Sequence, residues 1–500
     1  MLTLKRLPID TGHENVAFLS RACTVYHAEE FQSVPKVAVS DDRTTLLATL
    51  NLVDDPDLLG PDELGLSEQA FRQLGRPAGT RVTITEAPPP PSLDSVRAKI
   101  RGRALDPGEI RAVVADVVGE RYSRMELAAF LVASAGFLTT EEVLALTRAM
   151  VETGNRLEWH ERLVVDKHCI GGIPGHRTSM IVVPIVAAHG LPIPKTSSRA
   201  ITSPSGTADT MEVLAGVDVP MNRLRDIIDR ERGCIVWGGH MNLAPADDRM
   251  IAVERPLGFD TPEQMVASIL SKKLAAGSTH LLVDIPVGPT AKVRSATEAA
   301  RLRKLFEYVA DRTGVVLDTV VSDASEPVGN GIGPVLEVRD VLKVLRGDAD
   351  APRDLRDKAL MLAGRVLDFD PGLRGGAGRE RAQDLVDSGA ALKALERIVR
   401  AQGPVNPDDP LHPGAAPADK VHVVRSPADG TVRALDCERL SALARLAGAP
   451  TEKGAGLDLL CKTGDRVRAG DPLYRLHAAL DTDFRTAARA ADAASGYTVA

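Results

Sequence analysis

Apolar stretches that alternate with helix-compatible segments, between Leu163 and about Leu342, constrain the fold of this 500-residue chain more than any other feature. Such alternation is typical of a largely parallel sheet covered by helices. We therefore expect an α/β domain over residues 163–400. The apolar stretches are Leu163–Asp166, Met180–Val186, Cys234–Trp237, His280–Ile285 and Val315–Val321.

Proline-rich segments divide the rest of the chain. Four prolines at Pro88–Pro91 cannot continue a helix or a sheet ladder, so residues 1–87 should form a separate β-containing domain. Apolar residues at helix spacing predict a helical domain over 92–162, with a return segment at about 245–275. A loop crowded with proline after Gly403 precedes an α+β domain over 404–478. The predicted fold is an α/β multidomain one.

Composition excludes several classes of protein. A net charge of −7 opposes nonspecific attraction to nucleic acid. Five widely spaced cysteines without a CxxC pair predict neither a disulfide framework nor a zinc site, and His240, Asp247 and Asp248 lack ligand spacing, so we expect no metal. The amino terminus lacks a signal-peptide stretch and no run is long enough to cross a bilayer, which predicts a cytoplasmic protein without a membrane partner.

The most informative stretch is Asp166–Thr178, which leaves a strand, crosses a glycine-rich turn and enters an apolar helix. Backbone N–H groups and the helix dipole bind anions at such junctions, and Lys167 adds a full positive charge. A second stretch, Lys195–Leu214, places hydroxyl groups and Arg199 before another helix. Ser205 and Thr207 could be simple caps, but so many donors favour a tetrahedral anion as ligand.

A third stretch, Phe259–Lys273, begins with Thr261 as a helix cap and Pro262 in the first turn. Asp260 is then left just outside the helix, where it can act as an acid. Ser268 and Lys272 are four residues apart and share one helix face. Taken singly, an aspartate in the position of Asp260 is more often a turn residue, and a lysine in the position of Lys272 is more often a solvated charge.

These three stretches together resemble the thymidine phosphorylase family, over about residues 92–476. The amino-terminal domain and the Ser198–Ser203 loop resemble the archaeal-type branch, which contains AMP phosphorylases and proteins labelled thymidine phosphorylase. The resemblance implies Asp260 as proton donor, with Lys292 also in a catalytic position. It implies that phosphate and substrate bind at Lys167, His168, Gly172, Ser198, Arg199, Ala200, Ile201, Thr202, Ser203, Thr207, Ser268 and Lys272.

Two positions depart from the pyrimidine enzymes of that family. Cys169 stands where they carry serine, and a thiol is a much weaker hydrogen-bond donor. The segment Ile251–Pro256 stands where those enzymes carry an Ala-Leu-Arg-Asp-Val stretch whose arginine grips the pyrimidine, so we expect that clamp to be absent. The resemblance therefore leaves two substrates open, thymidine and AMP.

The implied reaction is phosphorolysis of an N-glycosidic bond, in which inorganic phosphate attacks the sugar while an acid protonates the departing base. It needs phosphate as a co-substrate and no cofactor. The expected partners are a nucleoside or nucleotide and a second copy of the chain, since family members are commonly dimers. Three alternatives stay open: a magnesium-dependent phosphoribosyltransferase of the related fold, a carrier role for the carboxy-terminal domain, and assembly through the amino-terminal domain.

Overall fold

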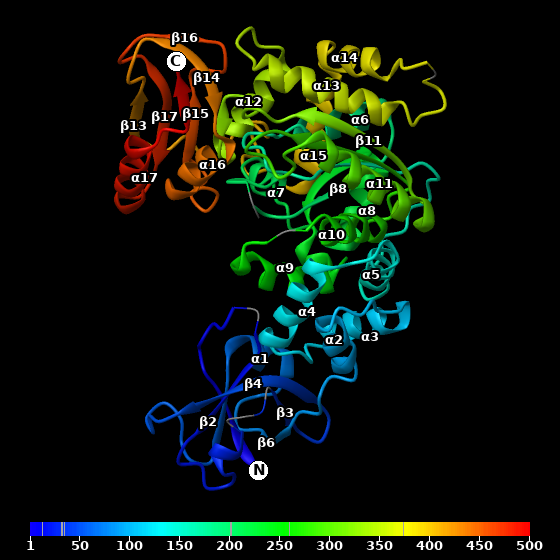
Figure 1. The fold of residues 1–500 in the computed structure, drawn as a ribbon, viewed down its shortest axis with the longest axis vertical. Helices are drawn as coiled ribbons and strands as arrows, with labels where there is room; N and C mark the ends of the chain where they lie inside the picture. The colour runs from blue at the N-terminus through cyan, green and yellow to red at the C-terminus, as the bar shows by residue number, and fades with distance from the viewer. Residues whose placement is uncertain (13, 32–33, 35, 201–202, 260, 374) are drawn as a thin grey trace. The chain divides into compact units, whose positions relative to one another are not determined.

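A computed structural model describes the chain except for residues 13, 32–33, 35, 201–202, 260 and 374 (Figure 1). The chain divides into two compact units. The first comprises Met1–Ala149 and Ala246–Asp260, and the second comprises Met150–Pro245 and Thr261–Ala500. None of the helices that the described residues form is long and apolar enough to span a membrane.

The amino-terminal part of the first unit is a closed β-barrel with the strand order β1-β5-β2-β4-β3-β6. Aliphatic side chains such as Leu2, Leu19 and Val37 fill its interior, as the scarcity of aromatic residues leads one to expect. The elements are β1 (Leu2–Arg6), β2 (Val16–Ser20), β3 (Val37–Ser40), β4 (Thr45–Val53), β5 (Glu63–Leu66), α1 (Glu68–Leu74) and β6 (Arg81–Glu86), with a 3₁₀ turn at Ala28–Phe31.

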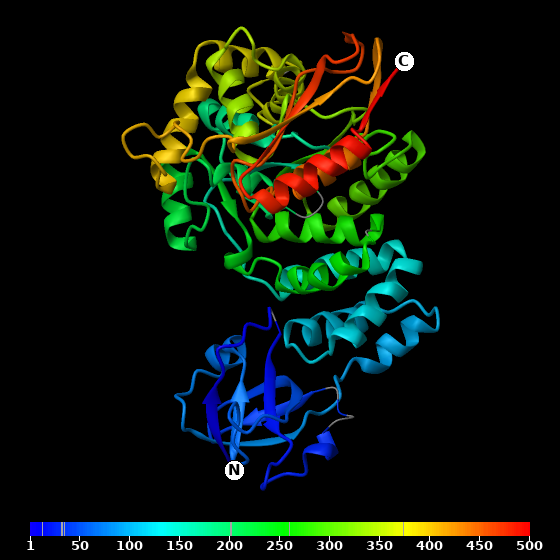
Figure 2. The same cartoon turned by 90° about the vertical axis from the view of Figure 1, so that its left-hand side faces the viewer.

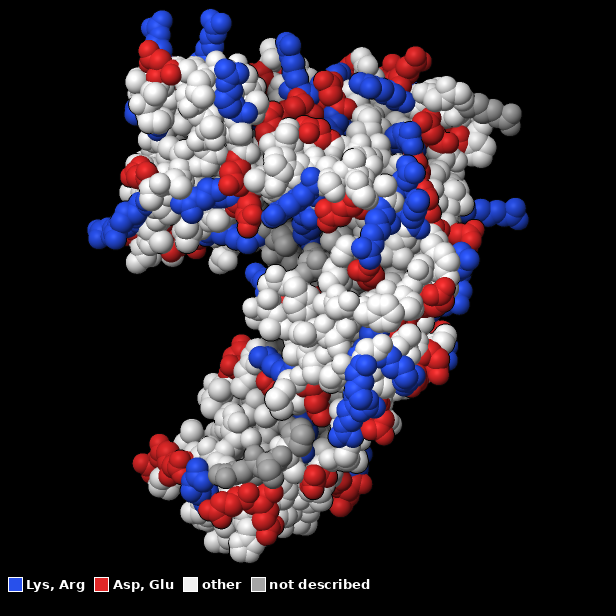
Figure 3. Space-filling view, viewed as in Figure 1, with Lys and Arg blue, Asp and Glu red and all other residues white. Residues whose placement is uncertain are grey.

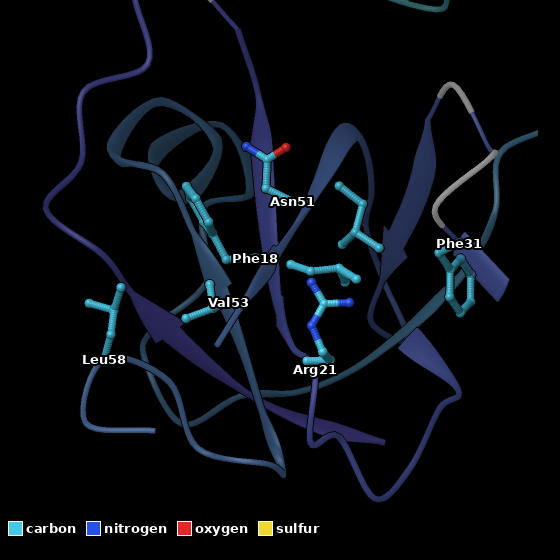
Figure 4. Close-up of a pocket in the computed structure, with 8 residues that line it drawn as sticks. Phe18, Arg21, Phe31, Asn51, Val53 and Leu58 are labelled. Atoms are coloured by element: carbon cyan, nitrogen blue, oxygen red, sulfur yellow. The ribbon is translucent and has the colours of Figure 1, made fainter. Parts of the chain in front are cut away.

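A pocket opens on the barrel (Figure 4). Apolar side chains line most of it, and one wall carries Arg21, whose guanidinium pairs with Asp54 at 2.6 Å. The labelled lining residues are Phe18, Arg21, Phe31, Asn51, Val53 and Leu58.

The rest of the first unit is helical, as predicted. Asp106 and Ser123 cap two of the helices with capping boxes, and a buried ion pair joins Lys99 to Glu142 at 2.6 Å. The return segment expected at about 245–275 is divided between the two units. Helix α9 lies almost wholly in the first unit, whereas α10 belongs to the second. The helices are α2 (Leu93–Ile100), α3 (Pro107–Val118), α4 (Arg124–Gly136), α5 (Thr140–Glu152) and α9 (Pro245–Leu257).

The α/β part of the second unit contains the parallel strands that the alternation predicted. Strands β11, β10 and β7 form one parallel sheet, and β8 and β9 form a parallel pair that lies beside β7. The strands are β7 (Val165–Cys169), β8 (Ile193–Ser197), β9 (Gly233–Trp237), β10 (His280–Val287) and β11 (Val316–Asp323). Strand β7 thus begins two residues later than the apolar stretch at Leu163 suggested.

Helices cover these strands (Figure 1). The apolar stretch at Met180 forms α6, which is buried along almost its whole length and lies at the centre of the largest core. This burial explains why α6 shows no polar face in the sequence. The helices are α6 (Ser179–His189), α7 (Thr207–Met211), α8 (Met221–Glu231), α10 (Pro262–Ala275), α11 (Ala296–Thr313), α12 (Pro334–Arg346), α13 (Arg353–Leu367), α14 (Gly378–Asp387) and α15 (Ala390–Gln402).

The carboxy-terminal part is built mainly from antiparallel strands around a second core. Helix α16 lies between β14 and β15 in the chain, and α17 lies along β13 and β17 (Figures 1 and 2). The domain continues past residue 478, because β18 pairs with β14. The elements are β12 (Gly331–Ile332), β13 (Lys420–Arg425), β14 (Gly430–Leu435), α16 (Cys437–Leu446), β15 (Gly456–Leu459), β16 (Arg466–Val467), β17 (Pro472–Ala478), α17 (Asp481–Ala493) and β18 (Tyr497–Val499).

Charges of both signs are interspersed over the face drawn in Figure 3, and the described residues form no continuous basic surface on that face.

Candidate active site

The first glycine-rich turn connects β7 to α6 and begins with a buried lysine. Lys167 is the central residue of β7, and its ammonium donates a 2.8 Å hydrogen bond to Thr178 Oγ1 at the start of α6. Burial lowers the pKa of Lys167. A cation is thus held at the junction where the sequence predicts an anion site.

Gly172 lets the turn approach the loop that follows β10. Its φ of +90° lies in the left-handed region, and a β-carbon there would come within 2.7 Å of the Lys292 backbone nitrogen. Only glycine fits such a position without displacing its neighbour. The turn therefore brings together two predicted site residues, Gly172 and Lys292, that are 120 residues apart in the sequence.

A group of buried lysines lies beside the turn. Lys273 of α10 donates to Asp166 Oδ2 at 2.6 Å and to the Thr196 carbonyl at 3.4 Å. Lys195 of β8 donates to the same carbonyl at 2.9 Å, so the two ammonium groups are close neighbours. Burial, followed by the charge of Lys273, holds the pKa of Lys195 well below its usual value.

His168 lies within the field of these lysines. Its Nδ1 is buried and has no hydrogen-bond partner among the described residues. Burial is the main reason why its pKa lies well below 6.5, and the charges of Lys195, Lys273, Lys167 and Lys272 lower it further. The site therefore has an excess of positive charge with a neutral imidazole in its midst, which is a suitable environment for a small anion.

The second loop, after β8, is organised differently. The Arg199 guanidinium donates to both carboxylate oxygens of Glu212 at 2.8 Å and to Asp209 at 3.2 Å. It also stacks over Trp237, at 4.9 Å from the ring centre. These contacts raise the pKa of Arg199, chiefly through the hydrogen bonds to Glu212, and they hold the side chain within the protein's own network.

The other described residues of that loop also bond to the protein itself. Asp209 Oδ2 accepts the backbone N–H groups of Ala200 at 2.7 Å and Gly206 at 2.8 Å. Ser203 donates to the Ser205 carbonyl at 2.6 Å. The Ser198 carbonyl accepts a hydroxyl hydrogen bond from Ser197 at 3.0 Å.

Neither of the residues considered as caps is the cap of α7. The N-cap is Gly206, and Thr207 is the first helical residue. The Ser205 hydroxyl instead lies 2.8 Å from Thr210 Oγ1 in the interior, because the chain enters α7 one residue later than a Ser205 cap would require.

Helix α10 begins as the sequence predicts. Thr261 is its N-cap and accepts the Gln264 backbone N–H, and Pro262 occupies the first turn. Ser268 and Lys272 are both half-buried on this helix, and Lys272 is near enough to His168 to affect its pKa. Three predicted residues, Asp260, Ile201 and Thr202, lie outside the described residues.

The structure adds site residues that the sequence did not single out, namely Asp166, Thr178, Lys195 and Lys273. Lys273 adjoins Lys272, and helix spacing alone does not tell which of two adjacent lysines faces the strands. A further group, formed by Cys169, His176 and Asp284, has the atoms to hold a metal ion.

Three family models match the chain in the order of its domains. The model described as "Glycosyl transferase family, helical bundle domain" matches residues 93–154. "Glycosyl transferase family, a/b domain" matches residues 161–392, and "Pyrimidine nucleoside phosphorylase C-terminal domain" matches residues 431–498. Fold and site together define an enzyme of the pentosyltransferase class.

Curated relatives extend over the whole chain, including the barrel. A protein from Bradyrhizobium diazoefficiens, with the name "Putative thymidine phosphorylase", is 57% identical over 498 residues, which cover 100% of this chain and 96% of the relative. A protein of the same name from Methylococcus capsulatus is 56% identical over 499 residues, with the same shares covered. This chain belongs to the thymidine phosphorylase family.

A solved structure shares the fold alone. Anthranilate phosphoribosyltransferase from Thermus thermophilus is 22% identical, with a TM-score of 0.52, and the match covers 62% of this chain and 99% of that one.

Proposed function

We propose that this protein cleaves the N-glycosidic bond of thymidine with inorganic phosphate and releases thymine and 2-deoxyribose 1-phosphate. The observation that carries the proposal is the group of buried lysines around the glycine-rich turn, with Lys167 held against Thr178 at 2.8 Å. The names of the full-length relatives support the same reaction. AMP phosphorolysis, the alternative, receives no specific support from these relatives.

Each part of the site has a task in this reaction. Phosphate would bind at the turn between β7 and α6, where Lys167 and the Gly172 backbone compensate its charge. Lys292 follows β10 and lies against Gly172, so it can reach the same anion. Ser268 and Lys272 of α10 would contact the nucleoside, and Asp260 would protonate the departing base.

Arg199 is placed differently in this proposal from what the resemblance implies. Its guanidinium is engaged by Asp209 and Glu212, so it would shape the second loop instead of binding phosphate directly. Within that loop, the proposed contacts to the sugar or the phosphate remain Ser198, Ala200, Ile201, Thr202, Ser203 and Thr207.

The reaction as written needs only small molecules, and we propose that it proceeds without a cofactor, in the cytoplasm, by a homodimer or larger homo-oligomer. Phosphate itself is the nucleophile, which is why no activated water or redox group is required. Native mass spectrometry of the purified enzyme would give the number of subunits, and a monomer would contradict that part.

The test is phosphate-dependent release of free base from thymidine, uridine, cytidine, adenosine, AMP and CMP. We expect thymine release that requires phosphate and falls about 10²- to 10⁴-fold in Asp260→Asn, as for loss of a general acid. The exposed Asp57→Asn change in the barrel is the matched control and should leave the rate unchanged. Release of adenine from AMP, with no base released from the other compounds, would show that AMP and not thymidine is the substrate. No release from any compound would refute the proposal.

A further inference from the structure

Cys169, His176 and Asp284 bring a thiol, an imidazole and a carboxylate together inside the α/β part. Cys169 ends β7, and Asp284 is its direct neighbour across the parallel pair on β10. His176 comes from the turn that leads into α6. One ligand atom from each residue lies within 4.8 Å of the other two, and His176 Nε2 is 3.3 Å from Asp284 Oδ2.

The carboxylate of Asp284 is incompletely satisfied. Asp284 is fully buried, and its Oδ1 accepts a 2.5 Å hydrogen bond from Ser322. Its Oδ2 points toward the group but receives no hydrogen bond from the described residues. The nearest polar atoms to Oδ2 are His176 Nε2 at 3.3 Å and the Lys358 ammonium at 4.0 Å, so this oxygen still has room to accept a cation.

The three donors of this group suit one kind of metal ion. Neutral imidazole with thiolate and carboxylate is a donor set typical of zinc, and three protein ligands leave a fourth position for a small molecule.

We propose that Cys169 Sγ, His176 Nε2 and Asp284 Oδ2 bind one Zn²⁺ ion. On binding, the Cys169 thiol releases its proton to the solvent and forms the metal–sulfur bond. The thiolate and the carboxylate then balance the two charges of the ion. Lys358, whose ammonium is 4.0 Å from Asp284 Oδ2, and Lys167 favour an anion as fourth ligand.

Zinc binding has a consequence for activity that rests on the proposed function. In the sequence, Cys169 follows His168 and directly precedes the glycine-rich turn. A zinc ion bound to its sulfur would therefore change the turn at which we propose that phosphate binds. Zinc should therefore inhibit phosphorolysis reversibly. Binding itself does not depend on phosphorolysis, because it is measured without nucleoside or phosphate.

The experiment uses the full-length chain after treatment with a chelator. Native mass spectrometry and competition with a chromogenic chelator measure the zinc stoichiometry and affinity. We expect one equivalent in the unaltered chain, and replacement by Co²⁺ should produce thiolate-to-cobalt charge-transfer absorption. Cys169→Ser and His176→Asn should each lower the affinity by more than the about 10- to 100-fold that loss of an outer-shell partner costs.

Cys461→Ser is the matched control, since Cys461 is also partly buried but lies in the carboxy-terminal part, and it should bind zinc unchanged. Circular dichroism checks that each variant is folded. If Cys169→Ser does not fold, the cobalt spectrum of the unaltered chain and the His176→Asn affinity decide. No bound equivalent, a cobalt spectrum without thiolate absorption, or equal loss in Cys461→Ser would overturn the proposal.

Discussion

The positive charges on β7 and β8 are held differently from the one in the loop that follows β8. Lys167 of β7 is bonded to a neutral hydroxyl, and the neighbouring Lys195 of β8 to a backbone carbonyl. After β8, Arg199 is held by two carboxylates, Asp209 and Glu212. The two strand lysines thus bond to groups without charge, whereas Arg199, like Arg177 in the turn after β7 through Glu337, is neutralised locally.

This difference indicates which loop can attract an anion. A lysine that bonds only to neutral groups still attracts an anion with its full charge. An arginine that bonds to a carboxylate through two N–H groups has its charge compensated and few donors free for a ligand. Asp166 is the carboxylate that offsets part of the first group, through Lys273. Four changes would test or break this contrast.

The largest effect on stability is expected from Asp166→Asn. Asp166 is fully buried, and Lys273 is only 2% exposed, so the change leaves a buried ammonium without its counter-charge. The free energy of unfolding should fall by about 3–5 kcal/mol, measured by urea denaturation. Glu396→Gln removes an exposed helix pair with Arg400 and should cost under about 0.5 kcal/mol. Equal losses in the two variants would show that the buried ion pair contributes no more to the free energy of unfolding than the exposed one.

Among these four changes, Lys167→Met should have the largest effect on activity. It removes a cation that we assign to the phosphate, and kcat/KM for phosphate should fall about 10²- to 10³-fold. Lys343→Met, which removes a lysine paired with the exposed Asp350, is the control and should be as active as the unaltered enzyme. Normal phosphate dependence in Lys167→Met would move the anion site away from the first loop.

Lys195 predicts a dependence of stability on pH. Its pKa in the folded chain is well below the usual 10.5, so between these two values the unfolded chain binds more protons. Its contribution to the free energy of unfolding therefore rises with pH, by up to about 1.4 kcal/mol per unit. Lys195→Met should exceed the unaltered chain in stability at pH 7, and the excess should shrink toward pH 10 in denaturation experiments. A difference that is constant with pH would contradict the lowered pKa.

Arg199→Ala should have the smallest effect. The Arg199 side chain is 40% exposed, so loss of its ion pairs should cost about 1 kcal/mol or less in thermal unfolding. KM for phosphate should hardly change, and Arg199→Lys should restore only part of the stability because lysine lacks the forked geometry. A rise in KM as large as that of Lys167→Met would restore Arg199 as a phosphate ligand.

Much of the fold could be predicted because its signals are local. Thr261 and Pro262 mark the start of α10 within a few residues, and the apolar stretch at His280 becomes β10. The end of the carboxy-terminal domain was harder to predict. Strand β18 is only Tyr497–Val499, and its place becomes evident only through pairing with β14.

The site was predictable to the extent that its residues adjoin a recognisable turn. Lys167 and Gly172 stand in the glycine-rich stretch, so their place at a strand-to-helix junction followed from the sequence. Lys273 lies 106 residues beyond Lys167, and nothing local indicates that its ammonium meets Asp166.

The sequence by itself determined the order of domains, the alternation of strands and helices, the glycine-rich turn between β7 and α6 and the membership of a phosphorylase family. Only the tertiary structure decided which charges are neutralised, as Arg199 is by Glu212, and which remain, as at Lys167. The physical reason is distance. Helix and strand propensities act between near neighbours in sequence, whereas ion pairing and desolvation depend on a few ångströms between residues that only folding brings together.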